Sequence, residues 1–180
     1  LRSGREDLVV GTPFAGRESL ETRSVVGLFV DMLVIRGDLA GRPTFVELVR
    51  RMHAAVTEAV DHRDVPFARL VEELDPGNGH RGLPFFDIVI NYTGDRQRIP
   101  ARWGDLVAEV VDLDAGTSTY ALTLFVRDEG RLKLELVHRT AALTTQAATA
   151  FLDDYRRLLR NACADPQRSI DDLAPLTREP

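Results

Sequence analysis

The sequence predicts an α/β sandwich in which helices flank one mixed sheet that contains both antiparallel and parallel strand pairs. The first observation is the order of the segments: two strands, two helices, a group of strands and a last helix. The second is the absence of the regular strand–helix alternation that marks a repeated βαβ fold. The third is composition, because 180 residues with 44% hydrophobic and 28% charged residues suit one globular unit with a core.

The first strands and a short helix are predicted from apolar runs and from the residues that end them. Residues 8–10 are apolar and predict a buried strand that runs into a loop at 11–13, where glycine and proline interrupt the run. A short helix is expected over 19–26, capped by its first serine. Residues 29–35 are rich in β-formers and predict a strand that ends at 37–38.

Two helices follow, and the first has the strongest periodicity in the chain. Apolar residues recur at helical spacing over 44–61, with Thr44 as N-cap and Glu47 as its partner in a capping box. Pro66 begins a second, shorter helix, because proline costs little in a first turn. The glycine-containing segment 75–79 ends it.

The second half of the chain predicts strands and then a helix. The expected strands cover 85–92, 106–113, 120–126 and 132–138. A turn at 128–130 joins the last two, where Gly130 allows positive φ. Thr144 begins a long helix that ends at 165–166, and the polar tail 169–180 is expected to be a linker.

Charge and cysteine usage narrow the function classes. Lys and Arg number 23 and Asp and Glu number 28, which gives a net charge of −5. This balance argues against nucleic-acid and anionic-membrane partners, which favour basic surfaces. No apolar run reaches the length of about 18 residues that a membrane-spanning helix needs.

The single cysteine, Cys163, is expected to be a small buried hydrophobe, and a cytoplasmic location is expected. Because the chain begins at Leu1, we expect it to be a part of a longer polypeptide.

The residues alone predict no self-contained active site. The histidines are His53, His62, His80 and His138, and no two of them have the spacing of a helical metal site. Each is expected to be structural or exposed. The sequence contains neither a nucleophile elbow nor a phosphate-binding glycine signature, and no metal is expected.

Four segments nevertheless resemble motifs that one known enzyme family shares. Residues 9–17 (VVGTPFAGR) resemble V-x-G-T-P-V-A-G-R, and residues 26–33 (VGLFVDML) resemble I-G-x-F-V-N-T-L. Residues 62–71 (HRDVPFARLV) resemble H-Q-D-V-P-F-E-R-L-V, and residues 84–89 (PFFDIV) resemble N-P-L-F-D-V. Each motif alone is weak, but the order and spacing of all four are specific. Together the four motifs resemble the C-terminal half of condensation domains from nonribosomal peptide synthetases, and the resemblance extends over about residues 7–177.

The resemblance implies a lobe with the chloramphenicol-acetyltransferase fold, one of two lobes arranged in a V. Residues 1–177 would form this lobe and 178–180 would begin a linker. The reaction of the family joins two aminoacyl or peptidyl thioesters, each carried on the phosphopantetheine of a carrier protein. Its catalytic H-H-x-x-x-D-G motif belongs to the other lobe or to the lobe junction, and this chain has no His-His pair. The chain alone is therefore expected to be inactive.

The same resemblance implies partners and site residues. The partners would be the N-terminal lobe, the upstream and downstream carrier proteins, and the adjacent adenylation domain; no cofactor would be bound directly. Arg17 would support the catalytic loop by pairing with its aspartate across the cleft, as a guanidinium can grip a carboxylate with two donors. Thr12, Pro13, Gly16 and Asp31 would belong to the tunnel and its lid. The alternative for Arg17 is an exposed loop arginine.

The chain departs from the family pattern at three places. Asp31 and Met32 replace N-T, so a charge stands where an amide is usual. Gly82 and Ala121 replace an arginine and an aspartate, and their joint loss predicts that the two positions are neighbours. Such departures keep two alternatives open: a condensation-like domain that recruits a tailoring enzyme without catalysing condensation, and a lobe of an epimerisation domain.

Overall fold

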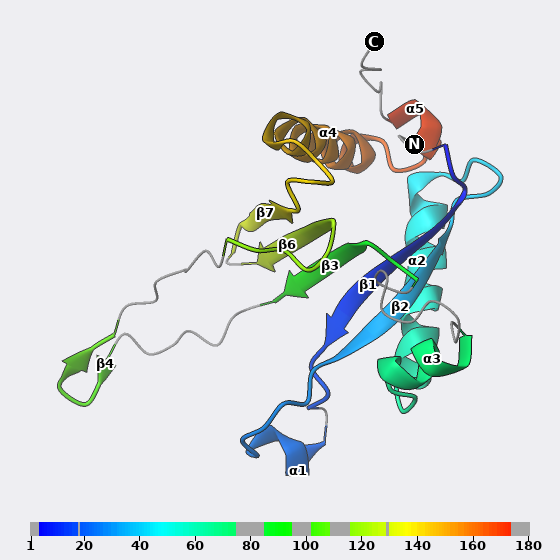
Figure 1. Cartoon of the computed structure of the whole chain (residues 1–180). Coiled ribbons are helices and arrows are strands. Elements are labelled where there is room, and N and C mark those ends of the chain that lie inside the picture. The colour runs from blue at the N-terminus through cyan, green and yellow to red at the C-terminus, as the bar shows by residue number, and fades with distance from the viewer. Residues whose placement is uncertain are drawn as a thin grey trace.

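A five-stranded mixed sheet in the order β2-β1-β3-β6-β7 forms the centre of the computed structural model (Figure 1). The structure describes residues 4–17, 19–74, 85–94, 102–108, 116–128 and 130–173. The strands are β1 (Asp7–Phe14), β2 (Asp31–Asp38), β3 (Ile88–Thr93), β6 (Leu122–Asp128) and β7 (Leu132–His138). The outer pairs β1–β2 and β6–β7 are antiparallel, and β3 runs parallel to both of its neighbours. The predicted mixed sheet with flanking helices is confirmed.

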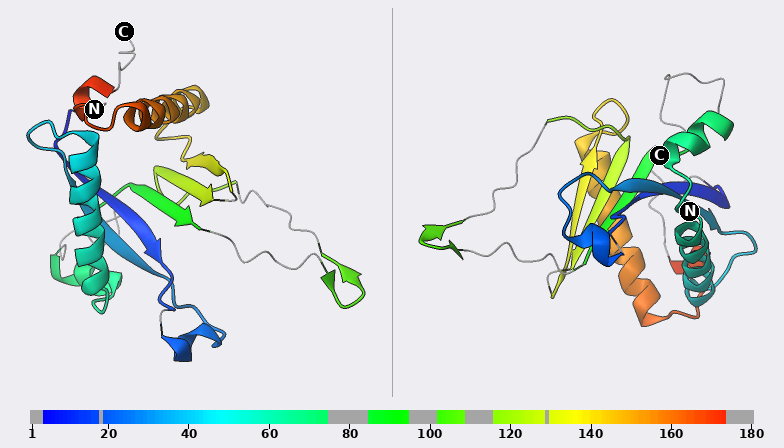
Figure 2. Two further views of the ribbon diagram at one scale, coloured as in Figure 1. Left: turned by 180° about the vertical axis from the view of Figure 1, so that it is seen from behind. Right: turned by 90° about the horizontal axis from the view of Figure 1, so that it is seen from below.

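Two long helices cover one face of this sheet. Helix α2 (Phe45–Asp61) packs against β2 and α4 (Thr145–Ala164) packs against β7, and both lie on the same side (Figure 2). The shorter α3 (Phe67–Leu74) contacts β2. Leu33, Ile35, Val89, Leu122 and Leu124 provide much of the buried apolar surface. The face that carries no long helix is the one on which α3 lies (Figure 2).

The first strand is longer than predicted, and the expected loop at 11–13 is wrong. Strand β1 pairs with β2 over eight positions, from Asp7 opposite Asp38 to Phe14 opposite Asp31. The partner strand supplies the hydrogen bonds that the local sequence does not suggest. Strand β3 pairs with β1 only at Gly11, so Pro13 lies where β1 has one partner, a position at which strands tolerate proline.

Three other predicted boundaries also move. Strand β2 begins at Asp31 and not at 29, and it continues through Gly37 and Asp38, which were expected to end it, because β1 pairs with it from Asp31 to Asp38. Strand β3 begins at Ile88 and not at 85, because Phe85 has a φ of 69°, which is incompatible with extended backbone. Of the predicted strand 106–113, the described residues 106–108 contain β5 (Leu106–Val107), which pairs with β4 (Arg102–Trp103); residues 109–113 lie outside the described part.

The C-terminal tail and the cysteine differ from expectation. The expected linker at 169–180 contains a helical turn, α5 (Ile170–Leu173), whose Ile170 and Leu173 are 6% and 0% exposed. The side-chain amide of Asn161 donates to the Leu173 carbonyl at 2.8 Å. Cys163 is exposed, contrary to prediction, because the adjacent Ala162 occupies the buried face of α4. Residues 174–180, including the predicted linker start, lie outside the described residues.

The predicted helix caps are confirmed. Thr44 caps α2: its Oγ1 accepts from the Glu47 amide at 3.2 Å, and Glu47 Oε2 accepts from the Thr44 amide at 2.8 Å. These hydrogen bonds from Thr44 hold the pKa of Glu47 below its ordinary value of 4.5. Thr144 caps α4 in the same way, through the amide of Ala147.

The Glu47 cap predicts a pH effect on stability. Because the folded state lowers the pKa of this carboxyl, its contribution is complete above the unfolded value near 4.5 and is lost as pH falls through the lower folded value. Glu47→Gln keeps an oxygen acceptor but does not titrate. We therefore expect the variant to lose less stability than the wild type between about pH 5 and pH 3. Urea unfolding followed by circular dichroism at both pH values measures this, and equal losses would contradict it.

Candidate functional site

The four motif segments meet at one end of the β1–β2 pair. The ladder places Thr12 opposite Leu33 and Pro13 opposite Met32, and it ends where Phe14 faces Asp31. The chain then turns through Gly16 and Arg17. The five site residues predicted from the sequence therefore all lie at this end, and each is half-buried. They are Thr12, Pro13, Gly16, Arg17 and Asp31.

An aromatic cluster underlies this end of the sheet. The Phe86 side chain is 4% exposed, and its ring lies 5.6 Å from that of Phe67 and 5.8 Å from that of Tyr120. Phe85 adds an edge contact to Phe67 at 6.2 Å. A Cβ on Gly11 would lie 2.2 Å from the Phe86 ring, so only glycine fits beneath it. The cluster therefore joins the first, third and fourth motif segments through packing.

Asp31 joins the second motif segment to the third. One carboxylate oxygen accepts from the amide of Met32 at 2.8 Å, and the other accepts from the amide of Phe67 at 3.3 Å. Phe67 is the first residue of α3, where amides lack partners within the helix and negative charge is favourable. The charge that replaces the family's amide therefore has a structural role, as a remote cap of α3.

Arg17 folds the segment that follows it. Its Nη1 donates to the carbonyls of Thr22 and Val25, and its Nη2 donates to that of Gly27, each at 2.7 Å. The guanidinium carbon also lies 4.5 Å from the centre of the Phe29 ring, a cation–π contact. These partners are not predictable from the sequence, because every residue carries a backbone carbonyl.

The same contacts explain why the first helix is shorter than predicted. Helix α1 (Leu20–Arg23) starts after the expected Ser19 cap but ends before 26. Arg17 binds the Thr22 carbonyl, to which a continuing helix would donate from residue 26. Gly16 has a φ of +65°, and a Cβ there would lie 2.3 Å from the Phe29 carbonyl oxygen. The turn therefore requires glycine both for its backbone angle and for space.

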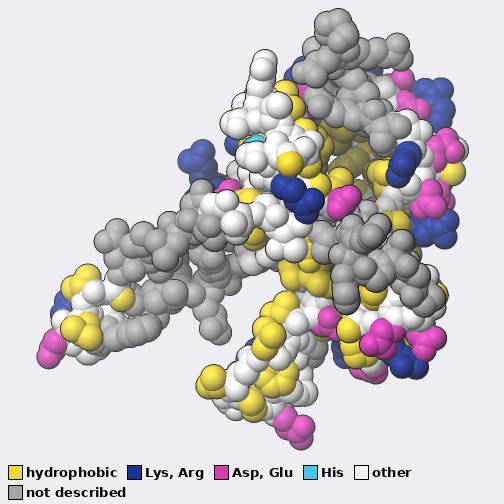
Figure 3. Space-filling view, in the orientation of Figure 1, with side chains coloured by type: hydrophobic (Ala, Val, Ile, Leu, Met, Phe, Trp, Pro, Cys, Tyr) yellow, Lys and Arg dark blue, Asp and Glu magenta, His cyan; other side chains and the backbone are white. Residues whose placement is uncertain are grey.

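The segment held by Arg17 is an apolar arm, which we define as residues 20–30. The arm contains α1 and projects from the body, and hydrophobic side chains gather on this projection at the bottom of the space-filling view (Figure 3). The exposed fractions are 80% for Leu20, 48% for Val25, 101% for Val26, 89% for Leu28 and 53% for Val30. Leu20, Val26 and Leu28 therefore lie almost entirely in solvent, and Val25 and Val30 are about half exposed.

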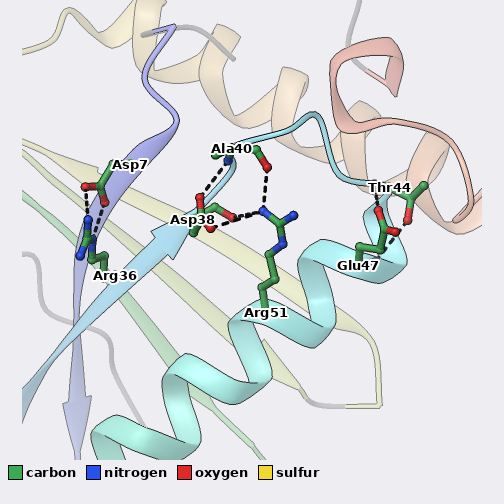
Figure 4. A network of polar contacts seen from close by, with 7 residues as sticks. All are labelled: Asp7, Arg36, Asp38, Ala40, Thr44, Glu47 and Arg51. Atoms are coloured by element: carbon green, nitrogen blue, oxygen red, sulfur yellow. Dashed lines mark hydrogen bonds and ion pairs between the residues drawn. The ribbon is translucent and has the colours of Figure 1, made fainter.

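A polar groove lies away from this site, between β2 and α2. Its volume is about 770 Å³, and its walls include Glu6, Asp38, Glu58 and His62. Nearby ion pairs and hydrogen bonds tie β1, β2 and α2 together (Figure 4). The Arg36 guanidinium grips Asp7 with two hydrogen bonds, at 2.9 and 2.8 Å, and lowers the pKa of that carboxyl. None of the five predicted site residues lines the groove.

The described histidines do not converge on the site. His53 and His62 are exposed on or beside α2, and His62 Nδ1 lies 2.9 Å from the Glu58 carbonyl. His138, at the end of β7, has a buried Nδ1 with no hydrogen-bond partner among the described residues. Gly82 lies outside the described residues, so its predicted proximity to Ala121 stays a prediction. In the described part of the chain, no three potential metal ligands group together, and no helix is long and apolar enough to cross a membrane.

Comparisons with known proteins agree on one family. Residues 2–179 match the family model described as Condensation domain. Surfactin synthase subunit 1 of Bacillus subtilis (strain 168) is 33% identical over 98% of this chain, which spans 5% of that protein. Phosphinothricin tripeptide synthetase PhsB of Streptomyces viridochromogenes is 41% identical over 69% of this chain, which spans 11% of that protein.

Solved structures give the same fold. One solved structure is the complex of the X-domain and OxyB from teicoplanin biosynthesis. The alignment covers 99% of this chain and 40% of the solved chain, with a TM-score of 0.77 and 27% identity. The first condensation domain of the CDA synthetase aligns with 98% of this chain and 39% of the other, with a TM-score of 0.72 and 20% identity. The chain thus spans about two fifths of these solved chains.

The Asp31 contacts predict the effect of removing its charge and its oxygen separately. Asp31→Ala leaves the Phe67 amide without its acceptor, so we expect a loss of about 1–2 kcal/mol in the free energy of unfolding. Asp31→Asn keeps an acceptor, so its loss is expected to be less than half as large. Urea denaturation measures both. Asp87→Ala, which removes an exposed carboxylate, is the control; a loss as large as that of Asp31→Ala would contradict the assignment.

The turn at Gly16 predicts a second stability difference. Gly16→Ala introduces a Cβ at positive φ and against the Phe29 carbonyl. Gly41→Ala is the matched control, because Gly41 has a φ of +79° with nothing within 4 Å of the added carbon. We expect the Gly41 variant to lose about 1–2 kcal/mol from backbone strain and the Gly16 variant to lose about 1–3 kcal/mol more. Thermal unfolding of both measures the difference, and equal losses would show that the collision is relieved.

Proposed function

Because the chain belongs to the condensation-domain family of nonribosomal peptide synthetases, we propose that it is the C-terminal lobe of such a domain and takes part in peptide-bond formation. The amine of one carrier-bound aminoacyl thioester attacks the carbonyl carbon of another. A C–N bond forms, the C–S bond breaks, and the phosphopantetheine thiol leaves with a proton. The lobe supplies a wall and a lid of the tunnel in which the two arms meet, together with part of the carrier-protein docking surface.

The observation that carries this proposal is the make-up of the candidate site. The end of the β1–β2 pair presents an arginine, a carboxylate already used as a helix cap, and main-chain groups. It brings no histidine among the described residues to the same place. A general base is therefore supplied by another part of the domain, and the family places it in the H-H-x-x-x-D-G motif of the partner lobe. The isolated chain is then inactive.

The exposed apolar arm supports a partner on this side. Val26 and Leu28 are 101% and 89% exposed, and side chains of this size gain about 1.5–3 kcal/mol each when buried. The chain also spans only 40% and 39% of the two solved chains compared above. We assign the remaining part of the domain as the partner, in addition to carrier proteins and an adenylation domain on the same assembly line.

Arg17 has the geometry for the cross-lobe role that the family resemblance implies. Three of its five N–H donors bind carbonyls of the arm. The Nε–H and one Nη2–H have no acceptor among the described residues. Two donors on one guanidinium are enough to grip a carboxylate. We propose that the aspartate of the catalytic motif takes these two, while Thr12, Pro13, Gly16 and Asp31 shape the tunnel and lid around it.

A second function is supported by one specific observation. The X-domain structure, solved with OxyB, is 27% identical to this chain, whereas the CDA condensation domain is 20% identical. In this alternative, the domain recruits a tailoring enzyme and does not form peptide bonds. The partner lobe separates the two proposals: an intact H-H-x-x-x-D-G motif fits condensation, and a broken one fits recruitment.

A reconstitution assay tests the proposed reaction. The 180-residue chain is mixed with two carrier proteins loaded with aminoacyl thioesters, and dipeptidyl product is measured by mass spectrometry. We expect no product from the chain and product from the two-lobe domain that contains it. Replacing both histidines of the partner lobe's motif is the control for a lost base. Product from the chain alone would overturn the lobe assignment, and a two-lobe domain that forms no product would contradict the proposed condensation.

A further inference from the structure

The apolar arm is both exposed and held in one conformation. An exposed apolar segment is usually a cost to a protein, because it favours aggregation. Here the arm carries three side chains that are at least 80% exposed: Leu20, Val26 and Leu28. Its backbone nevertheless has three charge-assisted hydrogen bonds at 2.7 Å, all from the guanidinium of Arg17.

Further contacts fix both ends of the arm. At its start, Ser19 caps α1 by accepting from the amide of Thr22 at 3.2 Å. At its end, the Phe29 ring packs under the Arg17 guanidinium, and the main chain enters β2 at Asp31, which is tied to α3. The fold thus fixes the arm while leaving its apolar side chains outside the core. Ordering a binding segment in advance lowers the entropy cost of association.

We propose that the arm is a preformed docking surface for the partner lobe of the same domain, with Arg17 as the positioning residue that keeps it preformed. The inference rests on the proposed function and adds to it a specific contact surface. The occupant follows from place: the arm projects from the same end of the β1–β2 pair as the candidate site (Figures 1 and 3). A lobe that brings a catalytic histidine to this site meets the arm as it does so.

The roles proposed for Arg17 are compatible because they use different donors. Both hydrogens of Nη1 and one of Nη2 bind the arm, and the remaining two can receive a carboxylate. Lysine at this position would keep the charge but offer no planar fork and no stacking on Phe29. Arg17→Lys therefore shows whether the arm needs the hydrogen bonds and stacking of the guanidinium or only a positive charge at this position.

Hydrogen–deuterium exchange of the two-lobe domain tests the inference, with mass spectrometry of peptides that cover residues 20–30. The variants are Arg17→Lys and the double variant Val26→Ser, Leu28→Ser. The matched controls are Arg36→Lys, at an exposed ion pair with Asp7, and Leu132→Ser, at a 63% exposed leucine on β7. The arm amides of the wild type are expected to exchange at least tenfold more slowly than unstructured amides.

The variants have distinct expected outcomes. The serine variant removes apolar side chains that make almost no contact within the chain, so faster exchange, by about tenfold or more, reports lost docking. Arg17→Lys is expected to accelerate the same peptides, and both controls to leave them unchanged. Exchange of the wild-type arm at the unstructured rate, or equal exchange in the serine variant, would overturn the inference.

Peptide-bond formation by the same samples keeps the two proposals apart. Product from a wild-type domain with an unprotected arm refutes docking and leaves the proposed function standing. A protected arm in a domain that forms no product supports docking and refutes the proposed reaction. If the arm is unprotected and no product forms, both are refuted.

Discussion

The eight-residue ladder between β1 and β2 determines where every candidate site residue lies. Its last pair, Phe14 opposite Asp31, fixes the point at which both strands leave the sheet. The arm begins and ends at this point. The Asp31 carboxylate reaches the first amide of α3 from the same position. A shift of one residue in the register would turn Asp31 to the other face of the sheet and separate it from Phe67.

Features that depend on neighbours in sequence could be predicted, and features that depend on distant partners could not. The Thr44–Glu47 capping box is complete within four residues, so its pattern was sufficient. The continuation of β1 through Gly11 and Pro13 depends on β2, which lies some twenty residues later in the chain. The burial of Leu173 likewise depends on the packing of a tail segment that its polar composition concealed.

The candidate site shows the same division. The motif resemblance identified Arg17 and Asp31, but the hydrogen-bond partners of both are main-chain groups, which every residue carries. The Phe29 ring under Arg17 and the Phe86 ring over Gly11 were also missed. For the contact between Phe86 and Gly11, the glycine itself was a signal, since a glycine within a strand often marks a site that another group approaches closely.

The structural role of Asp31 bears on how far this chain has diverged from its family. A charge in place of an amide would weaken a site if it stood unpaired in a buried tunnel wall. Here the carboxylate accepts two backbone N–H groups, one of them at a helix N-terminus, which are favourable partners for an anion. The substitution is therefore accommodated by the fold and does not by itself favour a non-catalytic domain. The distinction between condensation and recruitment rests instead on whether the proposed partner lobe carries an intact H-H-x-x-x-D-G motif.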